Sequence, residues 1–371
     1  RHDLASRAHD GAAVGRVVIE HGITFVVPEN RRINQDILIA PDGGSMVGAG
    51  EVVTVEIIEQ PNRHSKPIGR IVEVLGNYAD PGMEIEIALR KHELPFEFSA
   101  SALAEAAALP EALDPRHWQG RADLRALPLV TIDGETARDF DDAVFAEQAD
   151  AGWRLVVAIA DVSHYVAPGT ALDRESRARG NSVYFPRRVI PMLPEKLSNG
   201  LCSLNPGVDR LAMVCDMEID SHGEITAYRF YPAVFCSHAR LTYDQVWSWL
   251  AGTAQVTNEA ERALLPRLQA LYALFKVLCE ARSKRGAIDF ETIETVMLFN
   301  EHGKIENIVP LRRNDAHRLI EECMLAANVC ASDFLQRRRH PCLYRIHEGP
   351  TPERLEALRN FLREFGIGLG G

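Results

Sequence analysis

Four aspartates crowd one short stretch of this 371-residue sequence: within ten positions it carries Asp133, Asp139, Asp141 and Asp142. Apolar residues flank the run on both sides, at 127–130 and at 143–145. These flanks indicate that the aspartates lie beside the core, where crowded carboxylates stay ionised only if cations or hydrogen-bond donors compensate them. Magnesium suits this role, because it is a hard cation held by a few carboxylates together with waters and phosphate oxygens.

The acidic run also has to be tested against other interpretations. An EF-hand calcium loop that began at Asp133 would need glycine at its sixth position and glutamate at its twelfth. The sequence has Arg138 and Val144 there, so the spacing excludes such a loop. The pattern alone leaves two interpretations, a magnesium-dependent phosphodiester site and a solvated acidic turn.

The elements that precede the aspartates are predicted to be short strands. Val- and Ile-rich segments are separated by turn residues at 30–32 and 41–44, and they cover residues 14–20, 23–28, 36–40, 52–58 and 68–75. Five such segments in about 65 residues are typical of a small closed barrel of the oligonucleotide-binding type. Another small β-domain is the alternative. Residues 1–76 carry 8 basic and 10 acidic side chains, so this part has no basic surface to support nucleic-acid binding.

The chain changes character after the barrel. Residues 100–113 have a helical composition, and Pro110, Pro115 and Pro128 mark breaks. Beyond residue 128 we expect strands at 153–161, 211–220 and 224–235, and helices at 243–250, 258–281, 314–337 and 351–365. The predicted fold class is therefore multidomain α+β. Its predicted parts are a barrel over residues 1–78, a connector over 79–127 and a mixed α/β catalytic domain over 128–371.

Composition places the chain among ordinary globular proteins, with 46% hydrophobic and 25% charged residues. The formal net charge of −11 disfavours a protein that coats DNA electrostatically, but it does not exclude an enzyme that acts on nucleic acid. The seven cysteines contain no C-x-x-C pair, which predicts reduced, mostly buried thiols and no zinc cluster. No apolar run approaches a membrane span of about 18 residues, and the N-terminus is unlike a signal peptide. We therefore expect a soluble cytoplasmic protein without a membrane partner.

Longer motifs make the aspartate run specific. Residues 133–142, Asp-Gly-Glu-Thr-Ala-Arg-Asp-Phe-Asp-Asp, resemble the catalytic signature of the ribonuclease II/ribonuclease R family of exoribonucleases. The likeness spans most of residues 128–371 and continues through 153–163, 181–186, 190–194, 197–206, 237–243 and 313–324. Residues 22–28 are similar to the second cold-shock domain of the ribonuclease R branch, so the resemblance implies a cold-shock-like barrel.

The resemblance implies processive 3′-to-5′ hydrolysis of RNA with magnesium, releasing nucleoside 5′-monophosphates. All four aspartates would form the catalytic and metal site. Asp133, Asp139 and Asp142 are implied as metal ligands, and Asp141 as the metal-site residue whose loss affects the chemistry most. The implied partner is the 3′ end of single-stranded RNA, and the ribosome or the RNA-decay machinery are further partners by family resemblance.

Four residues are predicted to contact RNA by the same resemblance, because unpaired bases need stacking platforms: Tyr184, Phe290, Tyr243 and Glu321. Without the motif matches, each aromatic residue would more often belong to the core. Glu321 has independent support, because it follows one edge of an apolar stripe at helical spacing, where a polar group can face a cleft. A solvent-facing or salt-bridged glutamate is the alternative. Glu322 falls on the opposite edge of that stripe.

The resemblance departs at both ends of the sequence. The family's catalytic domain continues past the equivalent of Gly371, through a segment with an arginine near the scissile phosphate, into another RNA-binding barrel. A first cold-shock domain would precede Arg1. We therefore expect a fragment, with two candidate functions. The intact aspartate set favours a magnesium-dependent exoribonuclease, whereas the missing C-terminal part favours a non-catalytic RNA-binding fragment.

Overall fold

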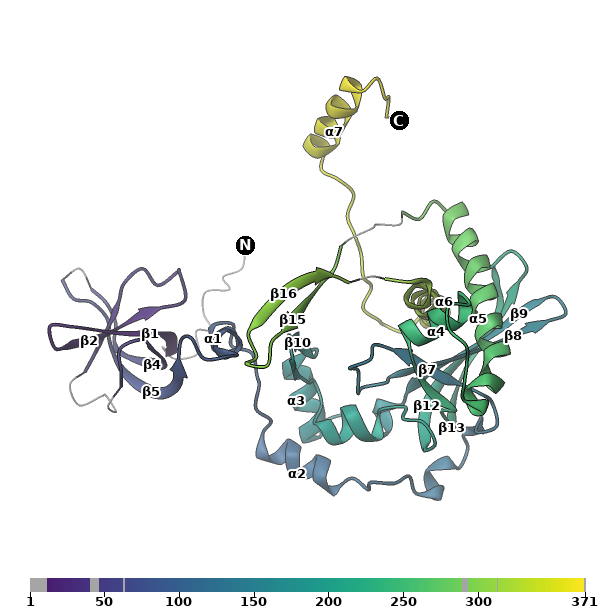
Figure 1. Cartoon of the computed structure of the whole chain (residues 1–371), viewed down its shortest axis with the longest axis horizontal. Helices are drawn as coiled ribbons and strands as arrows, with labels where there is room; N and C mark the ends of the chain where they lie inside the picture. The colour runs from purple at the N-terminus through teal and green to yellow at the C-terminus, as the bar shows by residue number, and fades with distance from the viewer. Residues whose placement is uncertain (1–11, 41–46, 63, 289–292, 312, 370–371) are drawn as a thin grey trace. The chain divides into compact units, whose positions relative to one another are not determined.

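The computed structural model of the chain describes residues 12–40, 47–62, 64–288, 293–311 and 313–369 (Figure 1). Contacts divide the chain into a compact unit over residues 1–324 and a second unit over residues 325–371. The first unit begins with a closed barrel in the order β1-β2-β3-β5-β4, which confirms the predicted barrel. Its strands are β1 (Ala12–Glu20), β2 (Ile23–Pro28), β3 (Ile37–Ile39), β4 (Glu51–Glu59) and β5 (Ile68–Asn77).

Successive side chains of a strand point to opposite sides of the sheet, so each strand directs one face into the barrel. The interior is filled by β-branched side chains, among them Val17, Val26 and Ile37. Gly69 lies where three strands meet, and a Cβ atom there would be 2.3 Å from Val55 Cγ1. Only glycine therefore allows β5 to approach its neighbours this closely.

The residues between the barrel and the large sheet contain two α-helices. The first helix, α1 (Met83–Lys91), was not predicted, and it packs Met83 and Ile87 against Val14 and Val52 of the barrel. The second helix, α2 (Ala100–Ala108), begins after Ser99, whose hydroxyl accepts a hydrogen bond from the Ala102 amide. It ends five residues before the predicted boundary, because Leu109 precedes a proline and adopts an extended conformation. A short 3-10 helix, η1 (Pro115–Trp118), follows.

A seven-stranded sheet is the centre of the first unit, in the order β14-β7-β8-β9-β12-β13-β6. Side chains of β8, β9, β12 and β13 form one apolar cluster with α2, and α5 contacts β8. The predicted strands at 153–161, 211–220 and 224–235 are confirmed within two residues. The sheet strands are β6 (Ala122–Asp123), β7 (Val130–Asp133), β8 (Asp142–Ala149), β9 (Gly152–Ala160), β12 (Asp209–Asp220), β13 (Ile225–Cys236) and β14 (Ala239–Thr242).

The other elements surround this sheet or follow it in the chain. The four predicted helices are confirmed as α4 (Tyr243–Leu250), α5 (Glu259–Lys284), α6 (Asp315–Arg337) and α7 (Pro352–Glu364). The first unit ends inside α6, and α7 belongs to the second unit. Elements that were not predicted are η2 (Val162–His164), α3 (Ala171–Arg179), β10 (Val183–Phe185), β11 (Arg188–Ile190), the π-helical η3 (Lys196–Leu201), β15 (Thr295–Phe299) and β16 (Ile305–Pro310).

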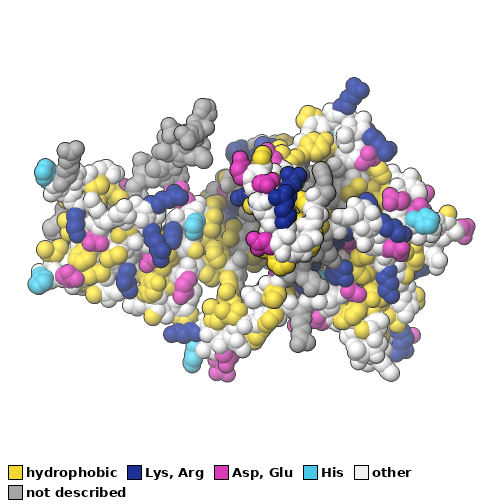
Figure 2. Space-filling view, turned by 90° about the horizontal axis from the view of Figure 1, so that it is seen from above, with side chains coloured by type: hydrophobic (Ala, Val, Ile, Leu, Met, Phe, Trp, Pro, Cys, Tyr) yellow, Lys and Arg dark blue, Asp and Glu magenta, His cyan; other side chains and the backbone are white. Residues whose placement is uncertain are grey.

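The charged surface and the cysteines match what the composition predicts. On the face in Figure 2, basic and acidic side chains are interspersed, without one continuous basic patch. The seven cysteines are free thiols, and four of them are buried: Cys202, Cys215, Cys323 and Cys330. Within the described ranges, no helix is both long and apolar enough to cross a membrane.

Candidate active site

The four aspartates gather at one end of the large sheet. Asp133 is the last residue of β7 and Asp142 is the first of β8, and these strands pair antiparallel through Val130 and Val144. The loop 134–141 joins them and carries Asp139 and Asp141. On the far side of β8, the Ala160 amide of β9 donates a hydrogen bond to the Asp141 carbonyl over 2.9 Å. The apolar residues that flank the run are therefore the two strands that bring its ends together.

A buried serine anchors the aspartate loop. The Ser203 hydroxyl donates to the Arg138 carbonyl over 2.8 Å and accepts from the Phe140 amide over 3.1 Å. The Leu204 amide donates to the Phe140 carbonyl over 2.7 Å, and the Phe140 ring is buried in the core. Asp139 and Asp141 flank Phe140 in the sequence. The contacts of Phe140 with Ser203 and Leu204 therefore fix the backbone that carries both carboxylates.

Negative charge in the cluster is only partly compensated. Burial raises the pKa of Asp142 to about 7, and the charges of Asp141 and Asp133 add to this shift. Burial is also the largest cause that raises the pKa of Asp133, while the Gly134 amide opposes it. Asp141 keeps an exposed surface, yet partial burial and the charges of Asp139 and Asp133 raise its pKa. A bound cation would relieve this repulsion.

The donor set fits magnesium by its chemistry. All four groups offer hard carboxylate oxygens, which magnesium prefers, and this ion usually takes one or two carboxylates and completes its shell with waters and substrate phosphates. Over the residues that the structure describes, no group of three or more His, Cys, Asp or Glu side chains is arranged to hold a metal by itself. Any ion at this cluster would therefore depend on water or substrate for part of its coordination.

Tyr184 lies directly beside the aspartates. It stands in β10, and its hydroxyl donates a hydrogen bond to Asp139 Oδ2 over 2.9 Å. The side chain is 65% exposed, so the ring is available to a ligand rather than part of the core. The structure thus brings this predicted RNA-contacting residue to the acidic cluster.

Tyr243 approaches the cluster from another strand. It begins α4 directly after β14, which pairs parallel with β7 so that Thr242 lies opposite Asp133. Its ring stacks on His317 with centroids 4.0 Å apart. Burial raises the pKa of Tyr243, and so do the charges of Asp133 and Asp142, which places the phenol within electrostatic reach of the carboxylates.

Glu321 lies on α6, whose buried stripe matches the helical pattern: Ala316, Leu319, Ile320 and Cys323. Arg313 donates to Glu321, so the salt-bridged alternative describes this side chain in the structure. Glu321 nevertheless lies one helical turn after His317, whose ring stacks on Tyr243, and its charge adds to the raised pKa of Tyr243. Glu322 on the opposite edge is buried and pairs with Arg282 over 2.7 Å. Phe290 lies outside the described residues.

Two residues at the site were not predicted individually, although both fall within matched segments. One is Ser203. The other is Arg240, whose Nη2 donates to the Gly134 and Glu135 carbonyls and whose guanidinium lies 5.2 Å from the centre of the Phe140 ring. Arg240 also lines a cavity of about 830 Å³ together with Arg138, Lys196 and Asn199. No spacing rule in the sequence identifies such long-range contacts of the loop.

Comparison with known proteins defines the class first. The RNB domain family matches residues 121–368, and the cold-shock domain family matches residues 25–99. The chain is thus a cold-shock-type barrel followed by an RNB domain, which confirms the predicted fold class. Because the RNB match covers more than half of the chain, the chain belongs to the ribonuclease II/ribonuclease R family.

Individual relatives lie in the ribonuclease R branch. Ribonuclease R of Vibrio cholerae is 52% identical over 363 residues, covering 98% of this chain and 44% of the relative. The chain therefore spans less than half the length of this curated relative. A Mycoplasma genitalium RNase R in complex with ribose-methylated single-stranded RNA is similar with a TM-score of 0.90 and 30% identity, covering 97% of this chain and 56% of that one. The same protein in complex with double-stranded RNA gives 0.91 and 30%, covering 99% and 64%.

Proposed function

We propose that this chain carries the hydrolytic site of a magnesium-dependent, processive 3′-to-5′ exoribonuclease that releases nucleoside 5′-monophosphates. The single observation that carries the proposal is the under-compensated aspartate cluster beside the exposed Tyr184 ring. Membership of the RNB family and likeness to RNase R structures with RNA support the same chemistry. Such an enzyme would act in the cytoplasm, with the ribosome or RNA-decay machinery as further partners.

The aspartates would divide the work at the reacting phosphate. Asp133, Asp139 and Asp142 would hold magnesium, and Asp141 would complete the metal site and orient the attacking water. When bound, magnesium supplies a Lewis acid that neutralises the scissile phosphate and lowers the pKa of bound water. The Ser203 anchor keeps the loop backbone fixed, so that the carboxylates need little rearrangement during the reaction.

Aromatic residues beside the cluster would hold the RNA strand. The exposed ring of Tyr184 can stack on a base near the 3′ end, because every base offers a π-face. Tyr243 and Glu321 are proposed as further nucleotide contacts, and Phe290 as a stacking residue on the family resemblance alone. A strand held by its bases keeps its place after each cleavage, which is what processive hydrolysis needs.

The division into domains is a further proposal: a barrel over residues 1–78, a connector over 79–127 and a catalytic domain over 128–371. Limited proteolysis tests it. Early cuts between residues 92 and 99 or between 109 and 114 would support an accessible connector within 79–127, since the first stretch lies between α1 and α2 and the second between α2 and η1. Early cuts confined to the sheet strands would contradict it.

The function is tested by a time course on single-stranded RNA labelled at either end, with and without magnesium, using the protein at its full natural length. We expect 3′-labelled RNA to yield labelled mononucleotide at once, while 5′-labelled RNA shortens stepwise. Both reactions should stop when magnesium is chelated. RNA that is bound but stays intact would contradict the proposal and favour the non-catalytic alternative.

A further inference from the structure

The hairpin that carries Tyr184 has little support of its own. Strands β10 and β11 form a separate two-stranded sheet with three residue pairs, in which Tyr184 lies opposite Val189 and Phe185 opposite Arg188. An isolated hairpin of this size is marginally stable in water. Its turn also places Arg187 at φ 64°, a left-handed conformation that is uncommon for residues other than glycine. The position of Tyr184 therefore depends on contacts outside the hairpin.

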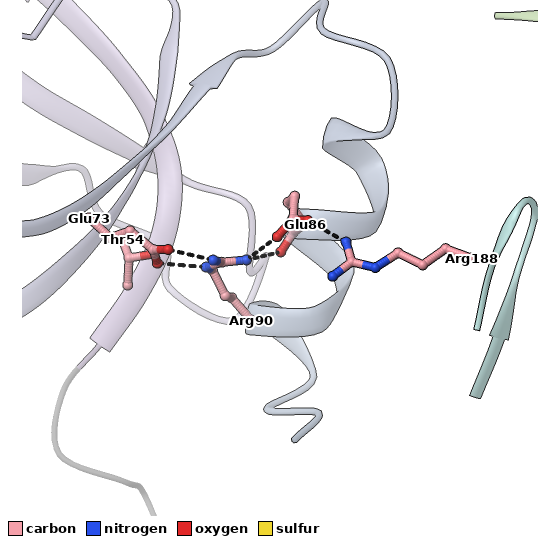
Figure 3. Close-up of polar contacts among 5 residues, drawn as sticks. All are labelled: Thr54, Glu73, Glu86, Arg90 and Arg188. Atoms are coloured by element: carbon pink, nitrogen blue, oxygen red, sulfur yellow. Dashed lines mark hydrogen bonds and ion pairs between the residues drawn. The ribbon is translucent and has the colours of Figure 1, made fainter. Parts of the chain in front are cut away.

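A chain of ion pairs connects this hairpin to the barrel (Figure 3). Arg188 of β11 donates from Nη1 to Glu86 Oε1 of α1. The other oxygen of Glu86 accepts from Arg90 Nη1 over 2.6 Å. Arg90 then makes a two-pronged contact with Glu73 of β5, at 2.8 Å from Nε and 2.6 Å from Nη2. We call these four residues the Arg188–Glu73 chain.

Within the Arg188–Glu73 chain, Arg90 is mostly buried and makes several contacts. The Arg90 side chain is only 12% exposed, and its guanidinium lies 4.9 Å from the centre of the Phe96 ring. Hydrogen bonds from Arg90 lower the pKa of Glu73, and those from Arg188 and Arg90 lower the pKa of Glu86 against the effect of burial. Because Met83 and Ile87 pack α1 on the barrel, Glu86 offers the hairpin a fixed point of attachment.

The ion pair between Arg188 and Glu86 is the contact that attaches the hairpin, and with it Tyr184, to α1. Glu86, Phe185 and Arg188 all line a cavity of about 1000 Å³, so α1 and the hairpin face each other across open space there. The Arg188–Glu86 ion pair joins α1 to the hairpin at the wall of this cavity. Arg187 and Phe299 line the same cavity, and the Arg187 guanidinium lies 5.4 Å from the centre of the Phe299 ring in β15. Two adjacent arginines thus attach the hairpin turn to two different elements.

We propose that Arg188, Glu86 and Arg90 are positioning residues that hold the β10–β11 hairpin so that the Tyr184 hydroxyl stays on Asp139. The consequence for RNA rests on the proposed function of Tyr184, whereas the attachment itself does not. Through this chain the barrel influences the grip on the last nucleotides without contacting them. Since Arg188 is 40% exposed, salt should weaken the effect.

The attachment is tested by hydrogen exchange of the amides of residues 183–190, measured by mass spectrometry on the protein at its full natural length. Arg188→Gln should speed this exchange about two- to fivefold, the change expected for a partly exposed ion pair. Arg188→Lys, which keeps the charge, should restore slow exchange in large part. Arg70→Gln is the matched control, because it removes an Arg–Glu pair from the same barrel strands, β4 and β5, without touching the hairpin. Unchanged exchange in Arg188→Gln would overturn the proposal.

The consequence for Tyr184 is tested by the length of the final RNA product. Arg188→Gln should lengthen it in the same direction as Tyr184→Ala, but less, and 0.5 M salt should do the same to the unmodified protein. Added to Tyr184→Ala, the Arg188→Gln change should have no further effect, because residues that act through one another are not additive. A normal product length in Arg188→Gln, or full additivity, would overturn the positioning role. If the unmodified protein cuts no RNA, the proposed function fails, while hydrogen exchange still decides the attachment.

Discussion

The Tyr184 hydroxyl donates a hydrogen bond to Asp139 Oδ2 over 2.9 Å, although the two residues are 45 positions apart. This contact holds a mostly exposed aromatic ring directly beside the aspartate loop. The same carboxylate is a proposed metal ligand. In the proposed function, Asp139 would thus connect the residue that grips the end of the strand with the site that holds the reacting phosphate.

Replacing Tyr184 separates the ring from the hydroxyl. Tyr184→Ala removes stacking that is worth about 1–3 kcal/mol per base, so we expect weaker binding of short RNA and a longer final product. Tyr184→Phe keeps the ring, and it should retain most of the affinity while losing the contact with Asp139. Equilibrium binding of short oligomers and a product ladder measure both effects. An unchanged ladder and unchanged affinity in Tyr184→Ala would rule out the stacking role.

Sugar chemistry gives a second test. A site that degrades RNA should sense the 2′-hydroxyl, which is the group that distinguishes RNA from DNA. Stacking and phosphate contacts do not require it, so single-stranded DNA should bind but be cut far more slowly. The measurement compares the cleavage rates of RNA and DNA strands of matched sequence, using the protein at its full natural length. Equal cleavage of both polymers would contradict this prediction.

Ser203 offers a test of the loop anchor. Its buried hydroxyl satisfies the Phe140 amide and the Arg138 carbonyl. Ser203→Ala leaves a buried N–H group without this acceptor, which should lower the free energy of unfolding by about 1–3 kcal/mol. Turnover should fall more than RNA affinity, because the loop carries Asp139 and Asp141. Ser101→Ala at the surface is the control, with an expected change within about 0.5 kcal/mol. Stability and turnover equal to those of the control would refute the anchor.

Much of this fold could be predicted from the sequence, because its elements have strong local patterns. The five barrel strands are rich in Val and Ile, and α5 repeats buried leucines at helical spacing, with Leu264, Leu268 and Leu271 as examples. The place of the aspartate run beside the core could be predicted as well, since the apolar segments that flank it form β7 and β8. These features depend on neighbours in the sequence, where periodicity carries the information.

What the sequence did not reveal depends on long-range contacts. The β10–β11 hairpin has three-residue strands, and contacts with α1 and β15 support it. Helix α1 is only nine residues long and interrupts its apolar residues with acidic and basic ones, and it is stabilised by packing on the barrel. Glu321 illustrates the same limit, because its helical face was predictable, whereas its pairing with Arg313 was not.

A buried ion pair predicts how stability depends on pH. Asp161 receives hydrogen bonds from Arg121 over 2.7 Å and from Ser163 over 2.6 Å. Burial alone would raise its pKa, but these two donors lower it below the ordinary value of 3.8. A carboxylate whose pKa is lower in the folded state stabilises the protein above its unfolded pKa. That stability is lost as the pH falls through the folded pKa.

Asp161→Asn should therefore lower the free energy of unfolding at pH 7 by about 2 kcal/mol. The deficit relative to the unmodified protein should begin to shrink as the pH falls below about 4, where the aspartate of the unfolded chain takes up a proton while the folded one is still ionised, and it should keep shrinking until the pH reaches the lower folded pKa. Urea unfolding at pH 7, 4.5 and 3.5 measures this change. A deficit that is the same at all three values would show that Asp161 contributes no pH-dependent stability.

The most direct test of the proposed hydrolytic site is Asp141→Asn, measured by single-turnover cleavage and equilibrium binding on the same RNA, with the protein at its full natural length. Asparagine keeps the size and one oxygen but removes the charge that would support magnesium and orient the attacking water. Asp150→Asn, in the exposed turn between β8 and β9, is the matched control. We predict that Asp141→Asn lowers the cleavage rate by several orders of magnitude while RNA affinity is kept or slightly increased. Near-normal cleavage would contradict the assignment of the site, and lost binding with an intact fold would make Asp141 a binding residue instead.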